Sequence, residues 1–287
     1  MREIRQGSVV HGRYRLEAQL AAGGQGRVWR AFDEVLHIAV AAKQVGLDPA
    51  ASERERAEAA ARTLHEARNA VRLRRHPNVV AVLDTFVEDG VPWVVTDLVE
   101  GCSLAQELAE RGPLPVAEVE RVAAGVLAAL GAAHELDIRH RDVKPANIMR
   151  TRGGEILLAD FGIAKHTDDT TLTKRNLVVG TLAYMAPERL AGRDLPAGDL
   201  FALGVSLYEL AQGVRPAAAT GSVEELRRAG RLAELILALL RKNPDERPDV
   251  PTAQRMLAAS KPAPAPAPEL SAAPERTKTE AEQEQTE

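Results

Sequence analysis

A short polar segment, His140–Asn147, is the feature of this sequence that most restricts its fold. It reads His-Arg-Asp-Val-Lys-Pro-Ala-Asn, and Asp160-Phe161-Gly162 follows after a predicted hairpin. A carboxylate can orient a hydroxyl and accept its proton, an ammonium can offset charge on a moving phosphoryl group, and an amide with a second carboxylate can hold Mg²⁺. A fold that brings Asp142, Lys144, Asn147 and Asp160 together would therefore have the groups that phosphoryl transfer needs.

The composition limits the class of protein. The length of 287 residues allows a substantial core, in one large domain or in two lobes. The formal net charge of −4 gives no sign of a nucleic-acid or membrane-binding surface. The single cysteine, Cys102, rules out an intramolecular disulfide and is typical of a reducing compartment.

No segment has the pattern of a leader or a membrane span. Residues 1–10 have no apolar core of signal-peptide length. The longest apolar run, residues 122–133, is too short to cross a bilayer. We therefore expect a soluble, cytoplasmic chain with no nucleic-acid partner and no membrane insertion.

The predicted secondary structure changes from strands to helices along the chain. Residues 12–45 alternate polar and apolar around a glycine cluster, which predicts a hairpin and a third strand. Residues 51–75 are rich in Ala, Glu and Arg without Gly or Pro, which predicts a helix. Two more strands are expected at 79–86 and 91–99, and later helices at 103–110, 116–135, 199–212, 223–241 and 252–259.

This order predicts an α+β fold with two lobes. After a short lead over residues 1–11, residues 12–100 would form a small antiparallel sheet with one main helix. Residues 101–259 would form a larger, mostly helical lobe, and a ligand is expected in the cleft between the lobes. Residues 260–287 begin with a Pro-Ala spacer and end in an acidic polar stretch, so we expect them to be disordered.

Further motifs accompany the polar segment. Residues 20–28 contain a glycine cluster, Lys43 ends Val-Ala-Ala-Lys, Glu66 lies in the predicted helix, and Gly180-Thr181 precedes Tyr-Met-Ala-Pro-Glu. In this order and spacing the motifs resemble the eukaryotic-like serine/threonine protein kinases of bacteria, from about residue 14 to residue 257. The resemblance implies the two-lobed protein-kinase-like fold, ATP with Mg²⁺ or Mn²⁺ as cofactors, and Ser or Thr hydroxyls of proteins as substrates.

The resemblance places the nucleotide on the first lobe. The ATP-binding positions there would be Leu20, Ala21, Gly23, Gly24, Gly26, Val28, Ala41, Lys43, Thr96, Asp97 and Val99. Ala21 stands where the family has its first glycine, which predicts a stiffer loop and weaker nucleotide binding. Lys43 would bind the α- and β-phosphates and pair with Glu66, since a buried lysine needs an anionic partner. Thr96 would stand behind the adenine, and the backbone at Asp97 and Val99 would pair with its edge.

The catalytic roles also come from the resemblance. Asp142 would orient the substrate hydroxyl and take its proton, and Lys144 is the residue that separates serine/threonine kinases from tyrosine kinases. Asn147 and Asp160 would bind Mg²⁺ through hard oxygen ligands. His140 is expected to pack in the core instead of acting as an acid or base.

Other positions are expected to support or regulate the site. The following loop offers Thr170, Thr171 and Thr173, and Arg141 would remain unpaired until a phosphothreonine forms there, at Thr171 or Thr173. A transient homodimer would allow that autophosphorylation. Thr181 would hydrogen-bond toward Asp142 and Lys144. Two buried supports are expected, a pair between Glu188 and Arg247 and an acceptor, Asp199, for the backbone of the catalytic loop.

Two other functions remain open. A catalytically weak or silent nucleotide-binding scaffold of the same fold would usually lack the lysine, the catalytic aspartate or the metal aspartate, and all are present here. A small-molecule phosphotransferase would lack Lys144 in this context and the 180–188 segment. The chain is also short between Gly213 and Leu232, so a helix that docks protein substrates is expected to be reduced to about 223–229.

Overall fold

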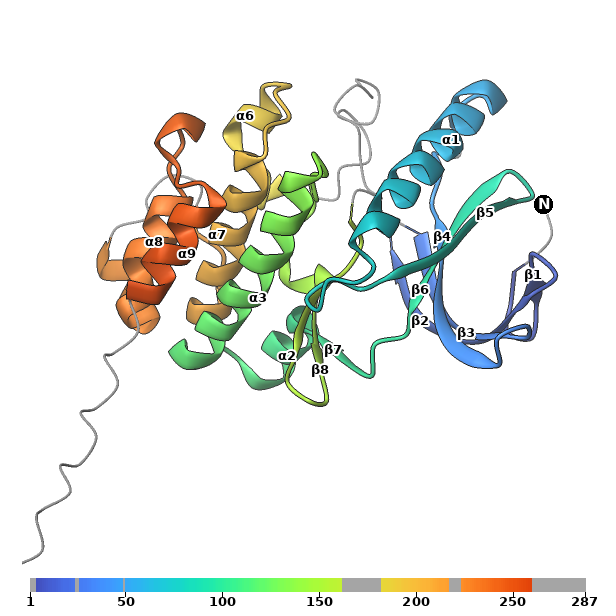
Figure 1. Ribbon diagram of the computed structural model, residues 1–287, viewed down its shortest axis with the longest axis horizontal. Coiled ribbons are helices and arrows are strands. Elements are labelled where there is room, and N and C mark those ends of the chain that lie inside the picture. The colour runs from blue at the N-terminus through green and yellow to red at the C-terminus, as the bar shows by residue number, and fades with distance from the viewer. Residues whose placement is uncertain (1–3, 24–25, 49, 162–181, 217–222, 260–287) are drawn as a thin grey trace, which may run out of the picture.

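The computed structural model describes residues 4–23, 26–48, 50–161, 182–216 and 223–259, which form two lobes (Figure 1). The N-terminal lobe contains an antiparallel sheet of six strands in the order β1-β2-β3-β4-β6-β5. The strands are β1 (Val9–Val10), β2 (Tyr14–Gly23), β3 (Gly26–Asp33), β4 (Ile38–Val45), β5 (Val82–Glu88) and β6 (Val91–Asp97). The sheet is curled, and helix α1 (Glu53–Ala70) lies along it (Figure 1).

The two faces of this sheet have different partners because successive side chains of a strand point to opposite faces. One face encloses a small core that includes Tyr14, Trp29 and Trp93. On the other face, Val45 belongs to the same buried cluster as Ala67 of α1. Lys43 lies two residues from Val45 and therefore points to this second face.

The start of α1 is set by its sequence. Ser52 and Glu55 form a capping box, in which the Ser52 hydroxyl accepts from the Glu55 amide and the Glu55 carboxylate accepts from the Ser52 amide. The α-helix continues into a 3-10 turn, η1 (Val71–Leu73). The helix predicted over 51–75 is thus confirmed, with the last positions in the tighter turn.

The C-terminal lobe is mostly helical. Its helices are α2 (Leu104–Arg111), α3 (Val116–Glu135), α6 (Pro187–Leu190), α7 (Ala197–Gln212), α8 (Ala233–Leu239) and α9 (Val250–Ala259), with the 3-10 segments η2 (Pro145–Asn147), η3 (Val223–Leu232) and η4 (Pro244–Glu246). A sheet of three short strands, β7 (Gly101–Ser103), β8 (Ile148–Thr151) and β9 (Ile156–Leu158), lies beside them.

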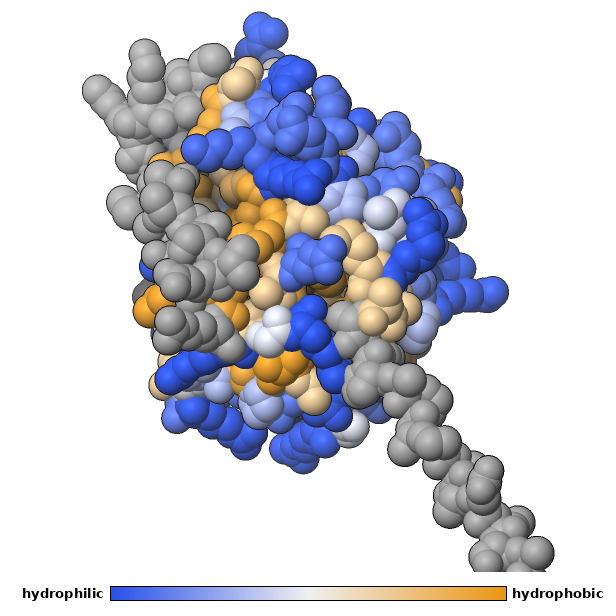
Figure 2. Space-filling view, turned by 90° about the vertical axis from the view of Figure 1, so that its left-hand side faces the viewer, coloured by the Kyte–Doolittle hydropathy of each residue, from blue (hydrophilic) through white to orange (hydrophobic). Residues whose placement is uncertain are grey.

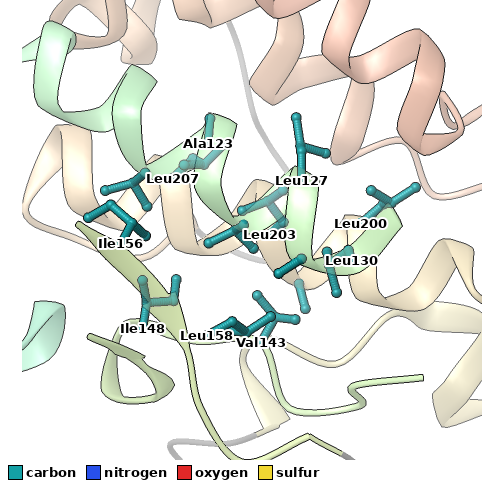
Figure 3. Packing of buried hydrophobic residues seen from close by; sticks show 14 of the residues in the cluster. Ala123, Leu127, Leu130, Val143, Ile148, Ile156, Leu158, Leu200, Leu203 and Leu207 are labelled. Carbon is teal, nitrogen blue, oxygen red and sulfur yellow. The ribbon is translucent and has the colours of Figure 1, made fainter. Parts of the chain in front are cut away.

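The core of this lobe supports the polar segment of the sequence. Leu127 and Leu130 of α3 meet Leu203 of α7, and Leu158 of β9 approaches them from the strands (Figure 3). Val143, between Asp142 and Lys144, is fully buried in the same cluster. The polar loop is thus fixed to the largest core of the molecule.

The outer end of the C-terminal lobe has a mixed surface. Figure 2 shows an apolar area on this end, bordered by hydrophilic residues. No helix within the described ranges is long and apolar enough to cross a membrane.

One predicted helix differs from the structure. The expected helix over 223–241 is instead the 3-10 segment η3 followed by α8, and η3 is itself interrupted where Gly230 adopts a φ of 51°. A strand was expected over 79–86. Its first residue, Val79, instead forms an isolated parallel bridge to Leu158, and β5 begins at Val82. The other predicted helices and strands are present, with shifts of a few residues at their ends.

Candidate active site

The two lobes meet at an ion pair between Lys43 and Asp160. Lys43 Nζ donates to Asp160 Oδ2 at 2.7 Å, and Lys43 is 7% exposed. Asp160 has a φ of 65°, a left-handed conformation that is uncommon outside glycine. Phe161 is buried and packs edge-on against His140, with ring centroids 4.7 Å apart.

The sheet register brings several predicted nucleotide positions together. Ala21 of β2 lies opposite Val28 of β3, which lies opposite Lys43 of β4. Residues directly opposite each other share a face, so these three side chains form a row on the face that carries Lys43. Ala41 lies on the same face, opposite Thr96 of β6.

The other predicted nucleotide positions lie in the hairpin of β2 and β3 and at the end of β6. Gly23 pairs with Gly26 across the hairpin, where Gly26 has a φ of 118° and an added Cβ would come within 1.9 Å of the Gln44 carbonyl oxygen. Leu20 is half exposed on β2. The Asp97 amide already donates to Ala81 O at 3.0 Å, and Val99 follows just beyond β6. Gly24 lies outside the described residues.

The Asp142 carboxylate is held by donors from its own loop. Lys144 Nζ donates to Asp142 Oδ2 at 2.7 Å, and Asn147 Nδ2 donates to the same oxygen at 3.0 Å. Asn147 Nδ2 also bonds the Asp142 carbonyl oxygen at 2.8 Å. Asp142 and Asn147 are both buried. The charge-assisted hydrogen bonds from Lys144 and Asn147 therefore hold the Asp142 carboxylate in one orientation.

The backbone of the loop is anchored to α7. Asp199 accepts the amides of His140 and Arg141 at 2.9 and 2.7 Å, and His134 Nε2 lies 2.9 Å from the same carboxylate. Burial alone favours the neutral acid, but the hydrogen bond and positive charge of His134 lower the pKa of Asp199 below its ordinary value. The predicted role of Asp199 as an acceptor is confirmed.

His140 is a packed residue, as expected. It is fully buried, and its Nε2 lies 2.8 Å from Ala159 O. Burial lowers the pKa of its imidazole, so the ring is neutral at physiological pH.

The expected pair between Lys43 and Glu66 is wrong for this structure. Glu66 instead forms an ion pair with Arg141, whose Nε also bonds Asp194 Oδ2 at 2.9 Å. The planar guanidinium of Arg141 can bind two carboxylates at once. The charge of Lys43 is neutralised by Asp160 instead of Glu66. The expectation that Arg141 is unpaired is therefore also wrong, because α1 and the segment before α7 both supply it with carboxylates.

The predicted buried pair between Glu188 and Arg247 is confirmed. Arg247 donates from Nη1 and Nη2 to the two Glu188 oxygens at 2.7 and 3.2 Å, and both side chains are almost completely buried. Arg247 also donates to Arg241 O and lies over the Phe201 ring. The remaining donors are thus satisfied, which a buried charge requires.

Two residues of the site were not predicted. Asp194 carries no motif that marks it as a partner of Arg141. Glu209, on α7, accepts a hydrogen bond from the Tyr184 hydroxyl, and the sequence gives no sign that these two positions meet. The predicted positions Thr170, Thr171, Thr173 and Thr181 lie outside the described residues.

The oxygen donors of the site fit a magnesium ion. No group of three or more His, Cys, Asp or Glu within the described ranges could hold a metal by itself. Mg²⁺ in phosphate-binding sites needs only one or two protein oxygens, because waters and phosphates complete its shell. Asn147 and Asp160 can supply these oxygens, and the Ala159 amide bonds Asn147 O at 2.9 Å, which places the two residues close together.

Comparison with known families agrees with this geometry. The model of the protein kinase domain matches residues 14–260 of the chain. The chain belongs to the protein kinase family. This membership confirms the two-lobed kinase fold that the motifs predicted, and the family uses ATP with a divalent metal ion.

Several bacterial kinases are similar in sequence. Serine/threonine-protein kinase PknA of Mycobacterium tuberculosis (strain ATCC 25618 / H37Rv) is 37% identical over 229 residues, which cover 76% of this chain and 51% of PknA. PknL of the same strain is 36% identical over 216 residues, 75% of this chain and 53% of PknL. The probable kinase PknB of Corynebacterium glutamicum is 37% identical over 215 residues, 72% of this chain and 32% of that protein. The chain thus aligns with about half or less of each relative's length.

Proposed function

We propose that this chain is a serine/threonine protein kinase that transfers the γ-phosphoryl group of Mg-ATP to Ser or Thr hydroxyls of proteins. The proposal depends chiefly on the arrangement of Lys43, Asp160, Asp142 and Asn147. The first two form a 2.7 Å ion pair between the lobes, and the last two share hydrogen bonds in the adjoining loop. The similar bacterial proteins are named as serine/threonine-protein kinases, which supports the same activity.

The described side chains suit the steps of this reaction. Asp142 would orient the hydroxyl and accept its proton, and Lys144, already bonded to Asp142, would offset charge on the transferred group. Lys43 would leave Asp160 to bind the phosphates. Mg²⁺, held through Asn147 and Asp160, would supply the positive charge that the phosphate oxygens need. At the adenine edge, Asp97 would contribute its carbonyl, because its amide is already bonded.

We propose further that the described conformation precedes activation. Catalysis in this family requires the strand lysine to pair with the helix glutamate, and here Arg141 holds Glu66. A phosphothreonine at Thr170, Thr171 or Thr173 would offer Arg141 a stronger anion and release Glu66 to Lys43. Autophosphorylation between two copies in a transient homodimer would supply that group.

The activity is tested with labelled ATP, Mg²⁺ and a mixed protein substrate. Asp142→Asn keeps the size of the side chain but removes the base, so we expect a loss of transfer of at least about 100-fold. The matched control is Asp137→Asn, at an exposed carboxylate near the same loop. Equal incorporation by wild type and Asp142→Asn would contradict the assigned mechanism.

Two further measurements separate the alternatives. Retained Mg-ATP binding without transfer to any protein, in the wild type, would favour the silent scaffold. Mass spectrometry of the active enzyme should find phosphate on at least one of the three threonines. Active enzyme without it would contradict the proposed activation.

A further inference from the structure

Arg189, on the short helix α6, carries a positive charge inside the C-terminal lobe. The residue is only 8% exposed, and burial lowers the pKa of its guanidinium below the ordinary value. An arginine still keeps its proton at physiological pH. The neighbouring carboxylate, Glu188, is bonded through both oxygens by Arg247. A buried charge is costly, so the groups that receive the charge of Arg189 indicate what it does.

The Arg189 guanidinium reaches the catalytic loop. Its Nη1 donates to the carbonyl oxygen of Arg141, the residue immediately before Asp142. The negative charges of Asp194 and Asp199 favour the charged guanidinium and offset part of the cost of its burial. The hydrogen bond therefore joins α6 to the backbone beside the proposed catalytic base.

The backbone that receives this hydrogen bond has an unusual conformation. Arg141 has a φ of 67°, in the left-handed region that residues other than glycine seldom adopt. Such a conformation persists only where surrounding groups hold it. The Arg141 amide donates to Asp199 Oδ1 at 2.7 Å, and the Asp142 amide donates to His140 Nδ1 at 3.3 Å. The Arg141 carbonyl, which lies between these two amides, is held by Arg189.

We propose that Arg189 is a positioning residue, which orients the Asp142 carboxylate through the Arg141 carbonyl. The inference rests on the proposed kinase function, in which Asp142 orients the substrate hydroxyl. The peptide group that joins Arg141 to Asp142 is planar, so a donor on its oxygen also restricts the backbone of Asp142. Orientation matters for the rate, because a displacement of about 1 Å at a catalytic group can cost about 100-fold.

Steady-state kinetics of the whole chain with a threonine peptide test the proposal. Arg189→Met removes the donor and keeps a long side chain, so kcat should fall about 10- to 100-fold. The KM for Mg-ATP should change less than about twofold, because the groups proposed to bind nucleotide stay in place. Titration with a non-hydrolysable ATP analogue gives the concentration of competent sites, so that an unfolded fraction is not counted as a lower kcat.

Two other variants complete the kinetic series. Arg193→Met, at an exposed arginine just beyond α6, should keep the kcat of the wild type. Arg189→Lys retains a charged donor without the guanidinium fork, so its kcat should lie between those of Arg189→Met and the wild type. It also replaces Arg189→Met in the other measurements if the methionine variant does not fold.

Hydrogen–deuterium exchange tests the position of the loop without phosphate transfer. In Arg189→Met, the amides of residues 140–143 should exchange about 10-fold faster, because the backbone there loses one of its holding groups. The amides of α7 should exchange at the rate of the wild type. This contrast separates a local effect on the catalytic loop from a general loss of stability in the lobe.

The outcomes distinguish this proposal from the proposed function. Wild-type kcat in Arg189→Met, or a rise in exchange that is equal in the loop and in α7, would overturn the role of Arg189. A wild type that transfers no phosphate would remove the proposed function instead. Exchange would then decide the role of Arg189 by itself: a rise confined to residues 140–143 would support its hold on Asp142, and no rise would overturn it.

Discussion

Arg141 shows how one side chain can connect separate parts of this site. Its backbone amide bonds Asp199, and its guanidinium binds Glu66 of α1 and Asp194. The sequence motif around Asp142 indicated that Arg141 binds an anion, but it did not identify Glu66 or Asp194 as partners. A charge partner depends on which side chains the fold brings within about 4 Å, and a single sequence does not record the position of α1 relative to the loop.

The buried pair of Glu188 and Arg247 should be essential for stability. Arg247→Met leaves the Glu188 carboxylate buried without its partner, so the free energy of unfolding should fall by about 3–5 kcal/mol. Denaturant unfolding measures the change. The matched control is Arg54→Met, at the exposed Arg54–Glu58 pair, which should unfold like the wild type. A loss in Arg247→Met no larger than in this control would contradict the assigned burial.

Low pH should lower the stability of the N-terminal lobe, because the Asp33 carboxylate becomes protonated. The Arg13 guanidinium holds the pKa of the buried Asp33 carboxyl at about 2, below the value of about 3.9 in an unfolded chain. A lowered folded-state pKa means that the stabilisation is present above about pH 4 and is lost as the pH falls toward 2. The stability difference between wild type and Asp33→Asn should therefore shrink over that interval in pH-dependent unfolding. A constant difference would contradict the assignment.

The crossing of α7 and α8 depends on a glycine. An added Cβ at Gly204 would lie 2.8 Å from Leu239 Cβ, whereas one at Gly198 of the same helix would meet Ala186 Cβ at 3.7 Å. Gly204→Ala should therefore lower Tm despite a gain in helix propensity of about 1 kcal/mol, since overpacking costs about 1–3 kcal/mol. Gly198→Ala should keep or raise Tm. Thermal unfolding of both variants tests the packing, and a more stable Gly204→Ala would contradict it.

At the scale of single elements, helices and strands that begin or end at a clear signal in the adjacent sequence were predicted. Ser52 and Glu55 carry a capping box, and α1 begins there. The interruption of η3 at Gly230 was missed, because a glycine in a helical pattern does not by itself require a positive φ. Val79 was assigned to a strand by its apolar neighbours, but its partner Leu158 lies far along the chain. Such long-range pairing is decided by tertiary packing.

The whole molecule should respond to nucleotide as one unit, because Lys43 and Asp160 join the lobes at the proposed phosphate site. Mg-ATP at 100 times Kd stabilises a folded protein by about 2.7 kcal/mol. For a domain of this size that corresponds to a rise in Tm of about 5–10 °C. Lys43→Met should lose most of the rise, and Lys242→Met, at an exposed lysine, should keep it. An equal rise in both variants would place the nucleotide elsewhere.

At the scale of the whole molecule, the sequence motifs predicted the fold and the contact between its two lobes. The two-lobed fold follows from motifs whose order and spacing are specific to one family, and the structure brings Lys43 and Asp160 into contact. The conformational state was not predictable. The motifs suggested Lys43 as the partner of Glu66, but the fold places Arg141 beside it, and a single sequence does not record that placement.

Val143 is an interior residue between Asp142 and Lys144, the proposed catalytic groups, and it belongs to the same core as the leucines of α3 and α7. Changes deep in the larger lobe can therefore displace Asp142 and Lys144 without touching either. A genetic screen for inactive variants would recover interior leucines such as Leu203 together with the aspartate. Many of those proteins would still be folded, with full expression and little turnover.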